Sequence, residues 1–143
     1  MKLNESFELD ISSDDFLDLI LKFEYYPKLL PQNILSTKIV SIENNIITTE
    51  EKLFVGKLLG KTITQKSTHE KKSNQVLNQI ISGPAKDTTF ILSINSVGDK
   101  SLITVDLELH LSLQYKILQP IIQKWYKRLI LSMLYRLNTI YDV

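Results

Sequence analysis

The sequence predicts an α+β domain in which a curved antiparallel sheet of seven strands wraps around one long C-terminal helix. Three observations lead to this prediction. Between residues 32 and 113, apolar and polar residues alternate in short segments, as they do in strands that bury one face. Only a few residues join one segment to the next, which favours antiparallel pairing of neighbours. From about residue 115 to residue 141, apolar residues instead recur at helical spacing.

The composition is that of a single small globular domain. The chain has 143 residues, 43% hydrophobic and 23% charged, and we expect one domain over residues 1–143. It has no cysteine, which excludes disulfides, thiolate metal sites and cysteine nucleophiles. The first residues alternate polar and apolar side chains, unlike a signal or transit peptide, and no apolar run approaches the roughly 20 residues that span a bilayer. We therefore expect a soluble, cytoplasmic protein.

The N-terminal region predicts one strand and two short helices. Residues 3–11 place apolar side chains on one face and acidic ones on the other, as in a half-buried strand. Ser12 has the hydroxyl of a helix cap, and two aspartates follow in the first turn, where they suit the helix dipole. Apolar spacing continues this helix to about Glu24. Tyr26 is expected to leave helical geometry because it precedes Pro27, and one more helical turn follows.

Six further strands are expected, each ending at a polar or glycine-containing turn. In the last strand the apolar side chains share one face, whereas Asp106, Glu108 and His110 share the other, so one face of the sheet is expected to be buried. The segment around His69 has no apolar alternation that indicates which face is internal. The expected strands are 34–42, 46–55, 61–70, 75–82, 88–97 and 102–112.

A long amphipathic helix is expected from about Tyr115 to Tyr141. Pro120 either begins this helix in its first turn, where proline is tolerated, or kinks a longer one. One face of the helix forms an unbroken apolar stripe. The stripe consists of Ile122, Tyr126, Leu129, Met133, Leu137 and Ile140, with Trp125 and Ile130 on its two sides.

Several local motifs carry a resemblance to a known family. The segment Phe23–Pro31, FEYYPKLLP, is similar to a "D-x-x-x-Y-P-x-F-x-P" joint between two small helices, and Val97–Thr104 resembles a glycine hairpin that leads into a last strand. Together with Ile81–Pro84 and the order of elements, they resemble the START-like superfamily, also called SRPBCC, over essentially the whole chain. The resemblance implies the helix-grip fold. Within the superfamily the chain is most similar to the polyketide cyclase/dehydrase and coenzyme Q-binding group, and Gly56–Lys61 is similar to the G-type subunit of carbon monoxide dehydrogenase.

The resemblance implies binding or carriage of a hydrophobic, lipid-like molecule, such as an isoprenoid quinone, with no cofactor. The resemblance favours a ligand pocket between the sheet and the helix. The alternative is that the apolar stripe of the helix only packs in the core. Arg136 lies within the stripe and either extends to solvent or meets a polar head group at the pocket mouth. The expected ligand-binding residues are Trp125, Leu129, Met133, Arg136, Phe90, Leu92, Val105 and Leu107.

Two other functions remain open. A cyclase or dehydratase would need an internal acid or base, for which His69 is the candidate if it points inward. A protein-interaction module would have a small or empty cavity. A metal site is not expected, because His69 and His110 lie on separate strands without partners at ligand spacing. Residues 56–62 are expected to form a hairpin loop, since a phosphate-binding loop needs four residues between its glycines and this segment has three.

The charge distribution bears on partners. The net charge of +1 argues against nucleic acid as a partner. Residues 1–24 contain seven acids and two lysines, whereas residues 114–143 contain five basic residues and one acid, Asp142. The basic C-terminal helix is either a solvated face or the site of peripheral contact with an anionic membrane or a partner protein.

Overall fold

The computed structural model describes residues 2–55 and 62–141, with the backbone alone at residues 140 and 141. The expected order of elements is confirmed, and the expected hairpin loop lies largely outside the described residues. The strands are β1 (Lys2–Leu9), β2 (Ile34–Glu43), β3 (Ile46–Phe54), β4 (Thr62–Lys72), β5 (Gln75–Ile80), β6 (Thr89–Val97) and β7 (Lys100–Glu108). The helical segments are α1 (Ser13–Ile20), the 3₁₀ turn η1 (Phe23–Tyr25), α2 (Tyr26–Leu29), the 3₁₀ segment η3 (Leu113–Leu118) and α3 (Gln119–Tyr141).

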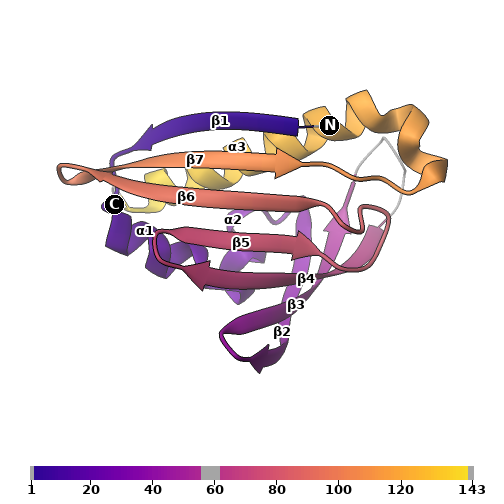
Figure 1. Ribbon diagram of the computed structural model, residues 1–143, viewed down its shortest axis with the longest axis horizontal. Helices are drawn as coiled ribbons and strands as arrows, with labels where there is room; N and C mark the ends of the chain where they lie inside the picture. The colour runs from indigo at the N-terminus through magenta and orange to yellow at the C-terminus, as the bar shows by residue number, and fades with distance from the viewer. Residues whose placement is uncertain (1, 56–61, 142–143) are drawn as a thin grey trace.

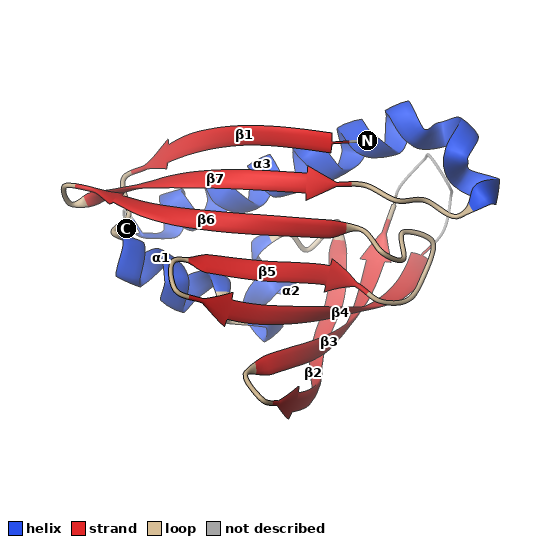
Figure 2. Cartoon of the chain, in the orientation of Figure 1, coloured by secondary structure: helices blue, strands red, loops and turns tan. Residues whose placement is uncertain are grey.

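The strands form one antiparallel sheet in the order β1-β7-β6-β5-β4-β3-β2. Six strands therefore pair with their neighbours in sequence, as their short connections predicted, and β1 closes the sheet against β7. The sheet curves strongly, so that β2 and β3 stand at a steep angle to β6 and β7 (Figure 1). The helices lie on one side of the sheet, behind the strands in the view of Figure 2, and α3 runs along that side. The predicted helix-grip arrangement is confirmed.

The joint between β1 and β2 confirms one local prediction and corrects another. Ser12 caps α1, because its side chain accepts a hydrogen bond from the backbone N–H of Asp15 at 3.2 Å. Tyr26, in contrast, does not leave helical geometry: its φ and ψ are −55° and −38°, and it begins α2. Pro27 is tolerated there because a first-turn residue needs no backbone donor. The Tyr26 hydroxyl also donates to the carbonyl oxygen of Ile20, which ties α2 to α1.

The long helix begins later than predicted. Residues from Leu113 form the 3₁₀ segment η3, and the α-helix starts at Gln119. Pro120 therefore lies in the first turn of α3, which decides between the two positions that its sequence allowed. Near its other end, the Asn138 side chain accepts a hydrogen bond from the backbone N–H of Asp10 at 2.9 Å, which fixes α3 to the end of β1.

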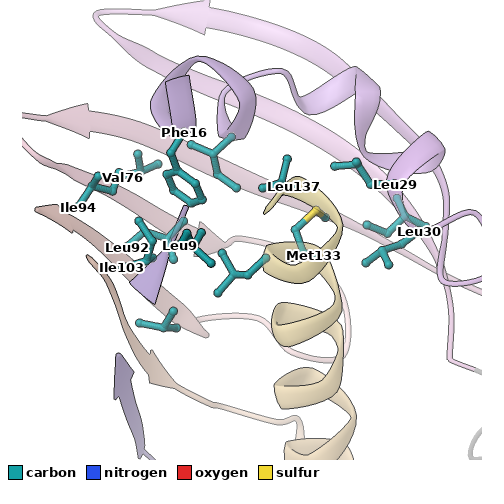
Figure 3. Close-up of a cluster of buried hydrophobic side chains, with 14 of the residues drawn as sticks. Leu9, Phe16, Leu29, Leu30, Val76, Leu92, Ile94, Ile103, Met133 and Leu137 are labelled. Carbon is teal, nitrogen blue, oxygen red and sulfur yellow. The ribbon is translucent and has the colours of Figure 1, made fainter. Parts of the chain in front are cut away.

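The core lies between the sheet and the helices. Phe16 of α1 and Leu137 of α3 are fully buried, and Figure 3 shows both pointing into a cluster with inward-facing strand residues such as Leu92 and Ile103. Met133, one turn before Leu137, projects from α3 beside the residues of α2 (Figure 3). The core is dense at this end of α3, whereas the middle of the helix lies over a cavity.

Candidate functional site

A cavity of about 120 Å³ lies between the middle of α3 and the curved sheet. Its lining residues come from α1, α2, strands β2 to β7 and α3, so most elements of the fold contribute to it. Most lining side chains are apolar, and the polar ones come mainly from β2 to β5. The apolar lining consists of Ile20, Ile34, Leu53, Val76, Ile80, Phe90, Leu92, Leu107, Leu129, Ile130, Met133 and Leu134; the polar lining consists of Thr37, Glu51, Gln65, Ser67, His69, Asn78 and Thr88, with Tyr26 and Tyr126.

The inward face of β4 supplies much of this polar wall. Ile63, Gln65, Ser67 and His69 are buried, while the residues between them are exposed or half-buried. Pairing fixes this choice of face: His69 lies opposite Asn78 of β5, whose side chain is also buried and inward. The question that the sequence left open about this strand is thereby answered, and His69 points inward.

Both ring nitrogens of His69 are occupied by protein partners. Asn78 donates through its amide nitrogen to the carbonyl oxygens of Val76 and Phe90, so its Oδ1 is the accepting atom. His69 Nδ1 therefore donates to Asn78 Oδ1, at 2.6 Å. On the other side Nε2 lies 2.8 Å from the Thr49 hydroxyl. The ring of His69 is thus held in place rather than free to meet a ligand through a nitrogen atom.

A short chain of hydrogen-bonding groups connects His69 to Glu51. The Thr49 hydroxyl lies 2.9 Å from Glu51 Oε1 and 2.8 Å from His69 Nε2. Glu51 Oε1 and His69 Nε2 are 3.8 Å apart. A hydroxyl has one proton, so it can donate to only one of these two acceptors at a time. Thr49, which is completely buried, is therefore the link through which the two titratable groups interact.

Burial dominates the electrostatics of His69. Loss of hydration lowers the pKa of His69 below its ordinary value, although the hydrogen bond to Asn78 and the charge of Glu51 both act to raise it. The ring also stacks on Phe23, with centroids 4.1 Å apart and an interplanar angle of 24°, which adds to its desolvation. The neutral imidazole is the favoured state in this apolar setting.

Glu51 stands near the centre of the polar wall. Its Oε2 accepts a hydrogen bond from Gln65 Nε2 at 2.7 Å, and its Oε1 accepts one from Thr49. Burial, and secondly the charge of Glu51, raise the pKa of Tyr26 and of Tyr126 well above the ordinary value. Both phenols therefore stay protonated and carry no negative charge.

The structure brings together most of the residues expected to bind a ligand. Phe90, Leu92, Leu107, Leu129 and Met133 line the cavity. The other three expected residues lie elsewhere in the described part of the chain. Trp125 lines a second, smaller cavity of about 20 Å³, Val105 is packed in the core, and Arg136 is exposed at the surface.

Apart from His69, no residue of the polar wall was predicted from the sequence. Thr37, Glu51, Gln65 and Asn78 have the residue types of solvated strand faces, and no apolar alternation marks them as internal. The one usable indication was Ile63, whose side chain is in phase with Gln65 and with His69 along β4.

His110 and the described residues as a whole offer no metal site beside His69. His110 is exposed and lies 3.4 Å from Glu108, on the outer face of the sheet and away from His69. Within residues 2–55 and 62–141, no three side chains of histidine, cysteine, aspartate or glutamate are grouped as metal ligands. In the same part of the chain, no helix has the length and apolar character needed to cross a membrane.

Comparison with known proteins identifies the fold. No protein-family model and no curated protein matches the sequence. Among solved structures, the chain is similar to a START superfamily protein from Mycobacterium smegmatis, with 18% identity, a TM-score of 0.80, and coverage of 99% of this chain and 97% of the other. An aromatase/cyclase from a Streptomyces species shares 8% identity at a TM-score of 0.80, over 99% and 93% of the two chains. Norcoclaurine synthase from Thalictrum flavum, in complex with dopamine and hydroxybenzaldehyde, shares 16% identity at a TM-score of 0.73, over 99% and 86%. The protein therefore has the START-like, helix-grip fold.

Proposed function

We propose that this protein binds or carries a small hydrophobic molecule in the cavity between α3 and the sheet. The observation that carries the proposal is the cavity itself, which is enclosed mostly by apolar side chains and has a few polar groups gathered on one wall. Burial of apolar surface contributes roughly 25 cal/mol per Å² to affinity, and a few polar contacts orient a ligand.

The size of the cavity limits the ligand. About 120 Å³ is less than the 300–1,000 Å³ or so of sites for drug-sized molecules, and is closer to an engineered apolar cavity of about 150 Å³ that binds benzene. A body the size of one aromatic ring fits this space. An isoprenoid quinone, the ligand implied by the family resemblance, is larger and requires α3 to move away from the sheet. Among proteins of the same fold, norcoclaurine synthase has been solved with dopamine and hydroxybenzaldehyde, which are one-ring molecules.

Filling the cavity with protein tests the proposal. Leu129 lines the cavity from α3, so Leu129→Trp should occupy the space and abolish binding of a one-ring probe such as p-cresol. The matched control is Leu131→Trp, the same change two residues further along the helix at a position that does not line the cavity. Isothermal titration calorimetry measures the binding, and circular dichroism checks that both variants fold. Equal binding to the wild type and to folded Leu129→Trp would refute the proposed site.

A second candidate function is an acid–base enzyme of cyclase or dehydratase type. The buried chain from Glu51 through Thr49 to His69 favours it, because such a chain can hold and pass a proton. The group that faces a ligand would be Glu51, with His69 acting from behind. If a substrate is found, Glu51→Gln should abolish turnover while binding of the substrate persists; unchanged turnover would exclude this function.

We also propose that the start of the C-terminal helical region contacts an anionic membrane. Leu113 and Ile117 of η3 are 83% and 87% exposed, and Ile121 of α3 is 50% exposed. These three residues are four apart in sequence; the exposed Lys116 lies between the first two, and the exposed Lys124 lies three residues after the last. Apolar side chains flanked by lysines suit a surface of acidic lipids. Lys127 contributes less, since it forms an ion pair with Glu5 of β1 at 2.7 Å.

A further inference from the structure

Three polar side chains that line the cavity form a row across the sheet. Thr37 of β2 pairs with Glu51 of β3, and Glu51 pairs with Gln65 of β4. Residues directly opposite each other on neighbouring strands have Cβ atoms about 4.5–5.5 Å apart on the same face of the sheet. All three side chains line the cavity. The strand register thus places a continuous polar strip against an otherwise apolar space.

Two atoms of this row lack a hydrogen-bond partner in the described part of the chain. They are Thr37 Oγ1 and Gln65 Oε1, and the two residues are only 7% and 4% exposed. The orientation of Gln65 follows from Glu51, because a carboxylate only accepts and its Oε2 faces the amide nitrogen. Gln65 Oε1 is therefore an acceptor without a donor among the described residues, and the Thr37 hydroxyl can either donate or accept. Buried polar atoms without partners are costly, so a ligand that supplies the missing bonds gains affinity.

The apolar part of the cavity lining indicates the chemistry of the rest of the ligand. Leu92 and Leu107 of the sheet, with Leu129 and Met133 of α3, offer only apolar contact. Glu51 lies between the two unpaired atoms, and its negative charge disfavours a ligand that is itself an anion. The matching chemistry is a neutral molecule with an apolar body and one hydroxyl group.

We propose that Thr37 and Gln65 make the cavity selective for neutral hydroxyl-bearing ligands, phenols or alcohols with an apolar body of about one ring. This inference rests on the proposed binding function and adds to it the chemical class of the ligand. Gln65 accepts a hydrogen bond from the ligand hydroxyl, and Thr37 supplies a second polar contact in the same row.

Two probes of nearly equal shape test the selectivity. p-Cresol and p-xylene differ by a hydroxyl in place of a methyl group, and a hydroxyl is costly to bury where it finds no partner. We expect wild type to bind p-cresol at least as tightly as p-xylene by isothermal titration calorimetry. In Thr37→Val and in Gln65→Met, the ratio of the two affinities should shift by about tenfold towards p-xylene, the effect of losing one good hydrogen bond. p-Toluate, an anion of similar shape, should bind much more weakly than p-cresol.

Thr64→Val is the matched control. Thr64 precedes Gln65 on β4, is exposed and does not line the cavity. This variant should keep the wild-type ratio, provided that circular dichroism confirms its fold. If both probes bind and the ratio is the same in wild type, Thr37→Val and Gln65→Met, the selectivity is overturned while the cavity remains a binding site. If neither probe binds to wild type, the proposed function fails as well.

Discussion

Two buried threonines, Thr37 of β2 and Thr49 of β3, differ in what their hydroxyl groups do. Thr49 connects Glu51 to His69, whereas the Thr37 hydroxyl has no partner among the described residues. Replacing a threonine by valine removes the hydroxyl with little change in shape. The same substitution should therefore have different effects on stability at these two positions.

Thr49→Val should lower the free energy of unfolding by about 1–3 kcal/mol, because it leaves buried polar atoms of Glu51 and His69 without their shared partner. Thr37→Val should leave the free energy of unfolding unchanged or raise it slightly, since it removes a buried group that makes no bond. Urea denaturation followed by circular dichroism measures both. Equal losses in the two variants would contradict the assignment of the hydrogen bonds.

The lowered pKa of His69 predicts a pH dependence of stability. An unfolded histidine binds a proton below about pH 6.5, but the folded protein resists protonation of His69 because the side chain is buried. The unfolded state then binds more protons, so the free energy of unfolding should fall as the pH drops below about 6.5. The groups that face this ring are Thr49, Asn78 and Glu51, with Phe23 stacked on it.

A pair of histidine variants isolates this contribution. In His69→Gln the decline between pH 7 and pH 5 should become smaller, as measured by urea denaturation across that range. His110→Gln removes the exposed histidine on the outer face and should keep the wild-type decline. A steep decline that persists in His69→Gln would mean that other groups control stability in this range.

The turn after β5 packs closely against β4, the strand that carries much of the polar wall. Gly83 has φ of +100°, and a Cβ atom built there would lie 3.1 Å from the Cβ of Gln65 and 3.2 Å from the carbonyl oxygen of Thr64. Gly98, in the β6–β7 turn, has φ of +66° and meets no atom of the described residues within 4 Å. Both positions favour glycine, but only Gly83 is also crowded.

Gly83→Ala should therefore destabilise the protein more than Gly98→Ala. The Gly98 change costs about 1–2 kcal/mol, the usual penalty for left-handed geometry, and Gly83→Ala adds contact with β4. Thermal unfolding compares the two variants. Because the crowded neighbour is Gln65, Gly83→Ala should also weaken p-cresol binding, while Gly98→Ala leaves it intact. If both changes lowered the free energy of unfolding equally, the close approach of Gly83 to β4 would have no effect on stability.

Elements were more predictable from the sequence than the site. Some features depend only on neighbours in the chain, so the local sequence was enough to predict them. They are the alternation of apolar and polar residues in the strands, the cap at Ser12 and the apolar stripe of α3. The helical geometry of Tyr26 was missed, because its contact with Ile20 depends on how two helices pack. The polar wall was missed for the same reason: whether Gln65 is solvated or buried depends on its pairing with β3 and on α3 above it, not on its own segment.

For the whole molecule, the two cavities have a common wall. Tyr126 lines both of them, and its ring packs edge-to-face on Trp125, with centroids 5.0 Å apart. Trp125 is the single tryptophan, so a ligand that displaces Tyr126 changes the surroundings of the only indole. α3 is fixed to the β1 region through Lys127 and Asn138, and this attachment opposes the movement that a larger ligand requires. A one-ring ligand needs no such movement.

Membrane contact would give such a carrier access to apolar molecules, and it makes a separate prediction. Leu113, Ile117 and Ile121 lie where the chain passes from β7 to α3, at the opposite end of the molecule from α1 (Figure 1). Vesicles that contain phosphatidylserine should bind the protein in a sedimentation assay, and vesicles of phosphatidylcholine alone should not. Added salt should weaken the binding, because attraction between charges is screened beyond about 8 Å at physiological ionic strength.

Substitutions at this turn test whether the protein binds vesicles through these side chains or through any exposed apolar side chain. Replacing Leu113 and Ile117 together by serine should abolish sedimentation with vesicles, since it removes the two most exposed apolar side chains at the turn. Ile42→Ser is the control: Ile42 is 65% exposed near the β2–β3 turn, so this change removes an apolar side chain from another surface and should leave the binding intact. Salt-independent binding to neutral vesicles would exclude the proposed preference for an anionic membrane, and equal loss in the control would exclude this turn as the contact. Binding of neither kind of vesicle at low salt would leave this turn as a surface for a partner protein or for solvent, and the cavity would have to be loaded from solution.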